Sequence, residues 1–240
     1  MSDSPSVEGP GAYGVVPPPV VTPPPISPSM SAHGPIEAVS PWLSIWTRPR
    51  ATLRLILDTN PRRGVFRLAA LGGIVESLSL ATGQGFGDTY SAPVLLALAL
   101  AGGAVGGVLL IIVFTAVMSL TGRWLGGRGG SVEVRAALAW ANVPGIWGLL
   151  LWLPRAALLG GEMFHPNPAG ILGNPPALLL YGLLQTVQVA IALWAFAISL
   201  KCLDEAHAFS AWRALGALIL GGFIVIVPIG LVVLAVQSLV

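Results

Sequence analysis

Residues 93–120, PVLLALALAGGAVGGVLLIIVFTAVMSL, are the stretch that decides the fold. This stretch has no charged residue and exceeds the about 20 apolar residues that a helix needs to cross a bilayer. The apolar runs of a soluble core are shorter and are interrupted by polar residues. The stretch therefore predicts a transmembrane helix.

The composition of the whole chain also indicates a protein that lies in a lipid bilayer. Hydrophobic residues make up 55% of the sequence and charged residues 9%, with a mean hydropathy of +0.82, whereas soluble domains average about a quarter charged residues. We expect an all-α integral membrane protein, a five-helix transmembrane bundle whose prolines within the spans kink the helices. The expected spans are residues 64–81, 93–120, 136–159, 176–200 and 214–240.

The basic residues alternate from one side of the membrane to the other. Cytoplasmic flanks of spanning helices concentrate Lys and Arg. With five spans and the N-terminus inside, eleven of the twelve basic residues are cytoplasmic and Arg155 alone is assigned to an outer loop. The distribution predicts a cytoplasmic N-terminus. The eleven residues are Arg48, Arg50, Arg54, Arg62, Arg63, Arg67, Arg123, Arg128, Arg135, Lys201 and Arg213.

The first 40 residues differ from the remainder, because they hold ten prolines and no Lys or Arg. Pro17–Pro19 and Pro23–Pro25 favour polyproline II structure, which has a solvated backbone. We expect residues 1–40 to be a disordered cytoplasmic tail. A ligand for a proline-recognising partner is the alternative.

Residues 41–63 predict an amphipathic segment before the first span. Thr47 is expected to cap a helix with Pro49 in its first turn. An interfacial helix would bury its apolar side in lipid and hold Trp42 and Trp46 at headgroup depth; the alternative is an ordinary solvated helix packed on another domain. Leu53, Ile56 and Leu57 lie on the apolar side, and Arg50, Arg54 and Asp58 on the other.

Among the polar side chains inside the expected spans, four are candidates for a site: Glu76, Asn142, Gln185 and Gln188. Such groups are costly in a bilayer, so we expect them to face the bundle interior and find partners. They are candidates for a proton, cation or substrate path, or for structural bonds between helices. Residues 64–240 form the membrane domain in this interpretation.

Four glycines in the second span, Gly102, Gly103, Gly106 and Gly107, make two overlapping small-xxx-small patterns. These patterns allow close helix packing, either within the chain or against a second copy. Asp204, Glu205 and His207 indicate a solvated turn. We find no catalytic motif, and expect no catalytic, cofactor-binding or metal site and no nucleic-acid partner.

Three segments carry a family resemblance: PWLSIWTRPRATLRLILDTNP before the first span, EVRAALAWANVPGIWGLLL at the third, and DEAHAFSAWRALGALIL leading into the fifth. Together they resemble the Yip family, named for interaction with Ypt/Rab GTPases, in its bacterial branch. The resemblance implies a five-helix membrane domain with a cytoplasmic N-terminus. Eukaryotic relatives act in vesicle traffic and bind Rab GTPases or membrane proteins. The family offers no catalytic residues to transfer.

Two functional hypotheses follow. The first is a non-enzymatic scaffold, adaptor or membrane-organising factor in a bacterial or archaeal plasma membrane, in contact with the lipid bilayer and with other membrane proteins or a second copy. The second is a transporter or channel for a small solute or ion that uses the inward polar residues.

Overall fold

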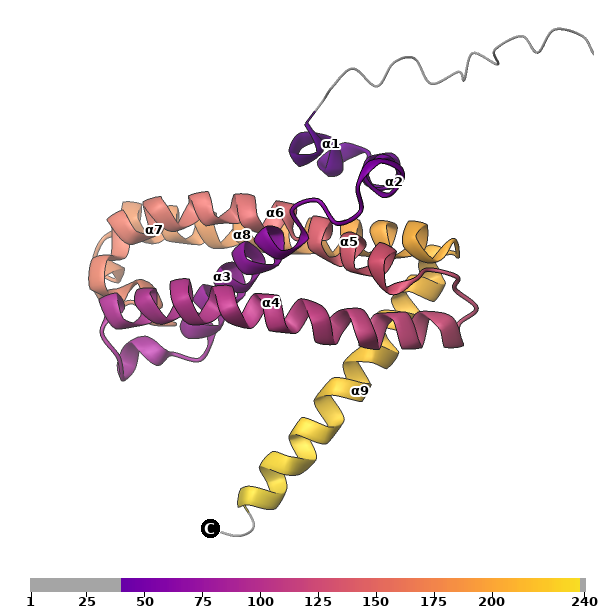
Figure 1. Cartoon of the computed structure of the whole chain (residues 1–240). Helices are drawn as coiled ribbons and strands as arrows, with labels where there is room; N and C mark the ends of the chain where they lie inside the picture. Colours follow the sequence, from indigo (N-terminus) through magenta and orange to yellow (C-terminus); the bar gives the residue numbers. More distant parts are fainter. Residues whose placement is uncertain (1–39, 238–240) are drawn as a thin grey trace, which may run out of the picture. The chain divides into compact units, whose positions relative to one another are not determined.

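The computed structural model describes residues 40–237, with side chains through Pro228, and this part of the chain contains helices and turns but no strand (Figure 1). The tail predicted for residues 1–40 lies outside it, apart from Ser40. The helices are α1 (Pro41–Thr47), α2 (Pro49–Thr59), α3 (Val65–Gly83), α4 (Ala92–Trp124), α5 (Ser131–Ala141), α6 (Val143–Trp147), α7 (Trp152–Leu159), α8 (Pro175–His207) and α9 (Ala211–Gln237). Short 3₁₀ turns are η1 (Phe86–Asp88), η2 (Gly148–Leu151), η3 (Gly160–Phe164) and η4 (Ala169–Ile171).

Within the described residues, five helical segments are long and apolar enough to cross a membrane, which confirms the predicted class. They are α3, α4, the composite segment Ser131–Phe164, α8 and the part of α9 up to Pro228. Each overlaps one of the five predicted spans. The structure extends the second, third and fourth spans beyond their predicted ends.

The third span is a broken helix rather than a continuous one. Its first break lies at Asn142, immediately before α6, where Pro144 occupies the first turn. Proline has no backbone N–H to donate, so the chain starts a new helix instead of extending the old one. The break leaves the Asn142 side chain beside Gly72 of α3, where a Cβ would lie 2.9 Å from Asn142 Nδ2.

Glycines set the contact between α3 and α4. A Cβ added to Gly73 would collide with the backbone of Gly103 and Gly107, so the absent side chains let the two backbones meet. Gly102 and Gly106 have open space around them instead. One predicted glycine pattern therefore packs within the chain, and the other faces outward.

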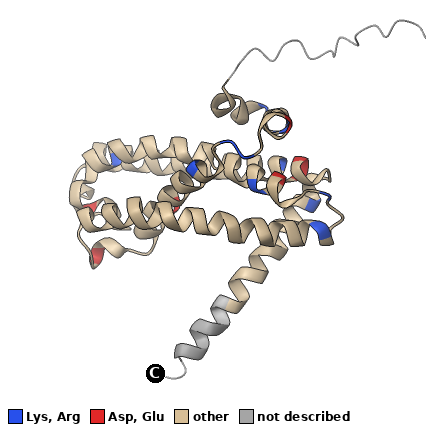
Figure 2. Ribbon diagram, viewed as in Figure 1, with Lys and Arg blue, Asp and Glu red and all other residues tan. Residues whose placement is uncertain are grey.

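Most Lys and Arg residues gather toward one end of the bundle, whereas Asp and Glu occur at both ends (Figure 2). We call the end that carries α2, the start of α3 and the end of α8 the basic end. The opposite end carries η1 and η3, where Nδ1 of His165, the residue after η3, lies 2.7 Å from Asp88 Oδ1 of η1. Arg155 lies in α7, inside the third spanning segment, which agrees with the expected span of residues 136–159 and not with the outer loop to which charge counting assigned it.

Candidate functional site

A polar groove runs between α3 and α8, both of which pack on α5 and α6. It consists of two adjoining cavities of about 190 and 260 Å³ that share Ser79 and Gln188 in their walls. The larger cavity is lined by Glu76, Asn142 and Gln188, and the smaller by Gln185 and Gln188. The structure thus brings together all four polar residues that the sequence singled out.

Helix α3 supplies one wall because its polar residues recur at helical spacing. Glu76 and Ser79 are three residues apart and both are exposed, so they share one face of the helix. Gly72 lies one turn before Glu76 and leaves room for the side chain of Asn142. Within the described residues Glu76 forms no ion pair.

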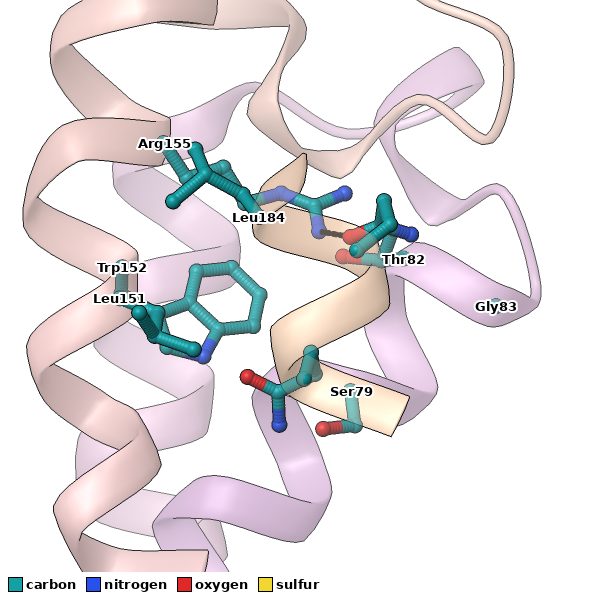
Figure 3. A pocket seen from close by; sticks show the side chains of 9 residues that line it. Ser79, Thr82, Gly83, Leu151, Trp152, Arg155 and Leu184 are labelled. Carbon is teal, nitrogen blue, oxygen red and sulfur yellow. Dashed lines mark hydrogen bonds between the residues drawn. The ribbon is translucent and has the colours of Figure 1, made fainter. Parts of the chain in front are cut away.

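Arg155 of α7 reaches into the smaller cavity (Figure 3). Only 8% of its surface is exposed. Its Nε donates to the Met163 carbonyl at 3.2 Å, and its Nη1 donates to Gln185 Oε1 at 2.7 Å. The guanidinium also lies 5.2 Å from the ring centroid of Trp152 and 5.5 Å from that of Tyr181.

Among the described residues, no acidic side chain forms an ion pair with the Arg155 guanidinium. Its Nη2 is buried and has no hydrogen-bond partner among residues 40–237. A buried donor that lacks an acceptor costs about 1–3 kcal/mol, and more when the group is charged. Sequence reasoning did not single out Arg155 as a site residue, because it counted the residue only as an outer-loop charge although the expected span of residues 136–159 includes it. The signal in the sequence is that Arg155 lies within the expected span of residues 136–159, with Trp152 three residues earlier, about one helical turn away.

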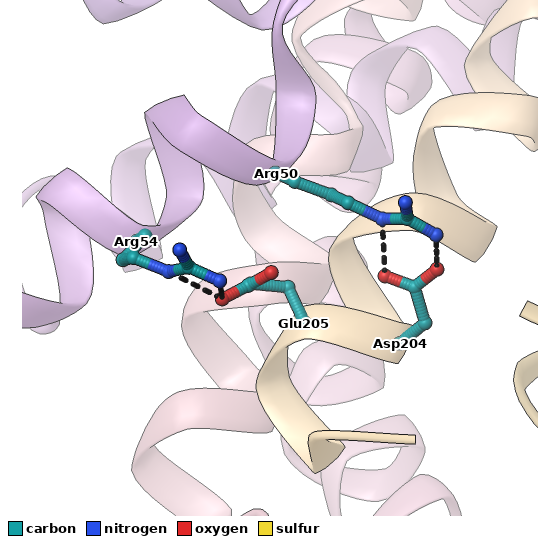
Figure 4. Close-up of polar contacts among 4 residues, drawn as sticks. All are labelled: Arg50, Arg54, Asp204 and Glu205. Carbon is teal, nitrogen blue, oxygen red and sulfur yellow. Dashed lines mark hydrogen bonds and ion pairs between the residues drawn. The ribbon is translucent and has the colours of Figure 1, made fainter. Parts of the chain in front are cut away.

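A second set of charges joins α2 to the end of α8 (Figure 4). Arg50 Nε donates to Asp204 Oδ1 at 3.0 Å, and Arg50 Nη2 pairs with Asp204 Oδ2, which makes a bidentate contact. Arg54 Nε donates to Glu205 Oε1 at 2.8 Å. The hydrogen bond from Arg50 to Asp204, with the charge of that carboxylate, raises the pKa of Arg50. We call these two pairs the clamp.

The clamp corrects the interpretation of the α8 end as a solvated turn. The Asp204 side chain is 2% exposed, and His207 is fully buried against the turn that connects α4 with α5. A Cβ at Gly122, Gly127 or Gly129 would collide with His207 or the backbone beside it. The end of α8 is therefore part of the packed structure.

The apolar side of α2 also packs on protein rather than on lipid. Leu53 and Ile56 are buried in one core cluster with Ala137, Trp140 and Cys202. The apolar pattern was read correctly, but the assignment of these two residues to lipid was wrong.

The start of this region also differs from its prediction. Thr47 ends α1 instead of capping α2, since Arg48 is the residue that precedes α2. Trp42 packs edge-on against Trp140 at 6.3 Å between ring centroids. The Trp46 carbonyl accepts a hydrogen bond of 3.1 Å from Trp194 Nε1 of α8. Headgroup contact of Trp42 and Trp46 stays a prediction.

A comparison with protein families matches the Yip1 domain to residues 43–234. The chain belongs to the Yip1 family. The match covers most of the chain, including the groove, the clamp and α2, and confirms the resemblance seen in the three sequence segments. Comparison with curated proteins and with solved structures gave no match. This Yip1 domain holds no group of three His, Cys, Asp or Glu side chains suited to a metal ion within the described residues.

Proposed function

We infer that this Yip1-domain protein is a non-enzymatic scaffold or adaptor of a bacterial or archaeal plasma membrane, with its basic end in the cytoplasm. The observation that carries the proposal is the fixed position of α1 and α2. Their inner side is buried against the spanning helices, and the clamp adds two ion pairs. Leu43 and Leu55 are left exposed on the outer side, among Arg48, Arg54, Arg62 and Arg63.

Such a surface is suited to another membrane protein, or a second copy, bound at the level of an anionic leaflet. Each basic residue near anionic lipid contributes about 1 kcal/mol, and the exposed leucines supply apolar contact area that salt does not screen. Because α2 is already docked, a partner would not have to order it on binding.

Photo-crosslinking in native membranes tests the adaptor role. A photoreactive amino acid at Leu43 or Leu55 should capture a discrete protein partner, whereas the same group at Val105, an exposed residue of α4, should capture mainly lipid. Asp204→Asn should weaken capture at Leu43, because it removes the charge that holds Arg50. Capture of lipid alone at all three positions would contradict the adaptor role, as would a reproducible turnover activity that Glu76→Gln abolishes.

The clamp offers a matched control for this experiment. Asp204→Asn should cost about 1.5–3 kcal/mol of stability, since it removes a charged hydrogen-bond acceptor from a buried position. Glu205→Gln should cost less than about 1 kcal/mol, because the side chain of its partner Arg54 is 68% exposed. Thermal unfolding in detergent measures the difference, and hydrogen exchange in α2 shows whether the helix leaves its site.

The cytoplasmic orientation is tested by cysteine labelling in sealed cells. The native Cys202 is fully buried, so its background should be small. Arg128→Cys should resist a membrane-impermeant reagent added outside, and Asp88→Cys should react. Labelling of Arg128→Cys from outside would reverse the topology.

The groove favours a second candidate function, the passage of a small solute or ion. Glu76 and Gln188 line it together in the spanning region, and intramembrane polar residues mark such paths. Flux into proteoliposomes tests this function, with Glu76→Gln and Gln188→Leu as variants. Flux that is absent, or equal in all three proteins, would exclude it.

A further inference from the structure

We propose that the groove binds the headgroup of a zwitterionic bilayer lipid, with its phosphate at Arg155 and its amine toward Glu76. The proposal is independent of the adaptor role, because the groove and the α1–α2 surface are different parts of the molecule. It rests on three features of the groove, which are a buried cation, a separate acid and an open side.

The first feature of the groove is its buried cation, the guanidinium of Arg155. Arg155 is more than nine-tenths buried, and its Nη2 lacks an acceptor among the described residues although the side chain lines the cavity. Its two protein acceptors, the Met163 carbonyl and Gln185 Oε1, are both neutral. A guanidinium presents its N–H groups in a planar fork that matches phosphate oxygens. A phosphate in the cavity would supply the missing charge, and it would supply the missing acceptor once the guanidinium turns toward it.

The acid lies in the adjoining cavity. Glu76 and Thr82, which lines the cavity of Arg155, are six residues apart on α3, or about 9 Å along the helix axis. That separation leaves room for a phosphate and an amine joined by two carbons. A second phosphate or a purely anionic headgroup would gain nothing from a carboxyl group at this place. The polar groups of Ser79 and Gln188 lie between the two ends, since they line both cavities.

The open side identifies a lipid rather than a free zwitterion as the occupant. Glu76 and Ser79 are exposed on the wall of α3, so the groove opens sideways from the spanning region. Phe196 of α8 lines the larger cavity and is itself exposed, so it offers an apolar surface that suits acyl chains. A lipid can enter from the bilayer with its tails on this surface, whereas a water-soluble ligand would have to leave water first.

Native mass spectrometry of the full chain in detergent tests the assignment. Phosphatidylethanolamine and phosphatidylglycerol with identical acyl chains are added at equal concentration. We expect phosphatidylethanolamine to bind about tenfold more tightly, the effect of about one charge-assisted hydrogen bond. Glu76→Gln should remove this preference. Arg155→Gln should weaken binding of both lipids.

Two further variants keep the test decisive if Arg155→Gln does not fold. Ser79→Leu adds bulk at an exposed position where the two cavities meet, so it should block binding of phosphatidylethanolamine while the protein stays folded. Asp58→Asn removes an exposed acid of α2 that does not line the groove, and it should leave binding unchanged.

Equal binding of the two lipids by the unmodified protein would overturn the proposal, as would binding that Ser79→Leu leaves intact. Free O-phosphoethanolamine is the third arm. If it displaces the lipid at equal concentration, the groove recognises a soluble zwitterion and the lipid assignment is wrong. If it fails to compete, the acyl chains contribute to binding as the open side predicts.

Discussion

Helix α3 has two unlike faces, and residues next to each other in sequence belong to different ones. Gly73 lies in the contact with α4, where a side chain would collide with the backbone of Gly103 and Gly107. Gly72 faces the groove, where a side chain would meet only the amide of Asn142. On the first face a small residue brings two backbones together. On the second it leaves space that polar side chains partly fill.

The two faces show how α3 can pack tightly against α4 on one side and border an open groove on the other. The α4 side is closed by backbone contact, which lipid cannot replace. The α8 side keeps Glu76 and Ser79 exposed and leaves a cavity. The rigid contact between α3 and α4 holds α3 in place. The polar face of α3 that carries Glu76 and Ser79 therefore needs no packing partner to keep its position. Changes on the two faces should therefore have different effects.

The largest effect should come from Gly107→Ala. The new Cβ would collide with the Ala69 carbonyl and with Gly73, so both helix backbones must move. Overpacking of this kind costs about 1–3 kcal/mol, and we expect the upper end because the neighbours are backbone atoms. Gly106→Ala is the matched control, since it has open space around it and should cost almost nothing. Thermal unfolding in detergent compares them.

Equal melting temperatures for the two alanine variants would show that the α3–α4 contact is looser than described. A change of oligomeric state in Gly106→Ala alone would instead mean that the outward glycine pattern packs on a second copy.

The next largest loss of stability should come from a substitution in the groove. Gln185→Leu removes the Nη1 acceptor of Arg155 and should cost about 1.5–3 kcal/mol, the range for hydrogen bonds to charged groups. Gln188→Leu, one turn away on α8, should stay within about 0.5 kcal/mol. The same unfolding assay measures both. A larger loss for Gln188→Leu would mean that the polar groups of the groove hold the fold together, as those of the clamp do.

Sequence reasoning reached the groove but not all of its parts. Glu76, Asn142 and the two glutamines were found because polar side chains stand out inside apolar spans. Arg155 was missed because counting of flanking charges cannot tell a residue beyond a helix end from one inside the last turns. The five spans followed from length and hydropathy alone, properties that need no knowledge of contacts.

The clamp shows a different limit. Arg50 and Asp204 are 154 residues apart, and no local pattern pairs them. Amphipathic spacing identified the apolar side of α2, but it could not tell whether lipid or protein covers that side. Leu53 would give the same pattern in either place. Only the packing of α2 on α5 and α8 decides between them.

A smaller effect is expected for Gly72→Ala. The added Cβ would lie 2.9 Å from Asn142 Nδ2, the end of a side chain that can turn away. The loss of stability should stay below about 1 kcal/mol, within the spread of minor substitutions. Gly73→Ala, one residue later, meets backbone and should cost more. Similar losses at the two positions, measured by thermal unfolding, would mean that Asn142 is held as firmly as the backbone of α4.

The smallest effect on stability, and the most direct view of the two faces, should come from cysteine labelling of α3. Ser79→Cys places a thiol in the groove, and Ser77→Cys places one toward Gly103, whose added Cβ would lie 2.7 Å from Ser77 Oγ. Neither change alters side-chain volume much, so unfolding temperatures should stay near that of the unmodified protein. In detergent, a small charged thiol reagent should modify Ser79→Cys quickly and Ser77→Cys slowly. Cys202 is fully buried and provides the background. Rapid labelling at both positions would mean that α3 and α4 separate often enough to admit water, and the contrast between the two faces would not hold.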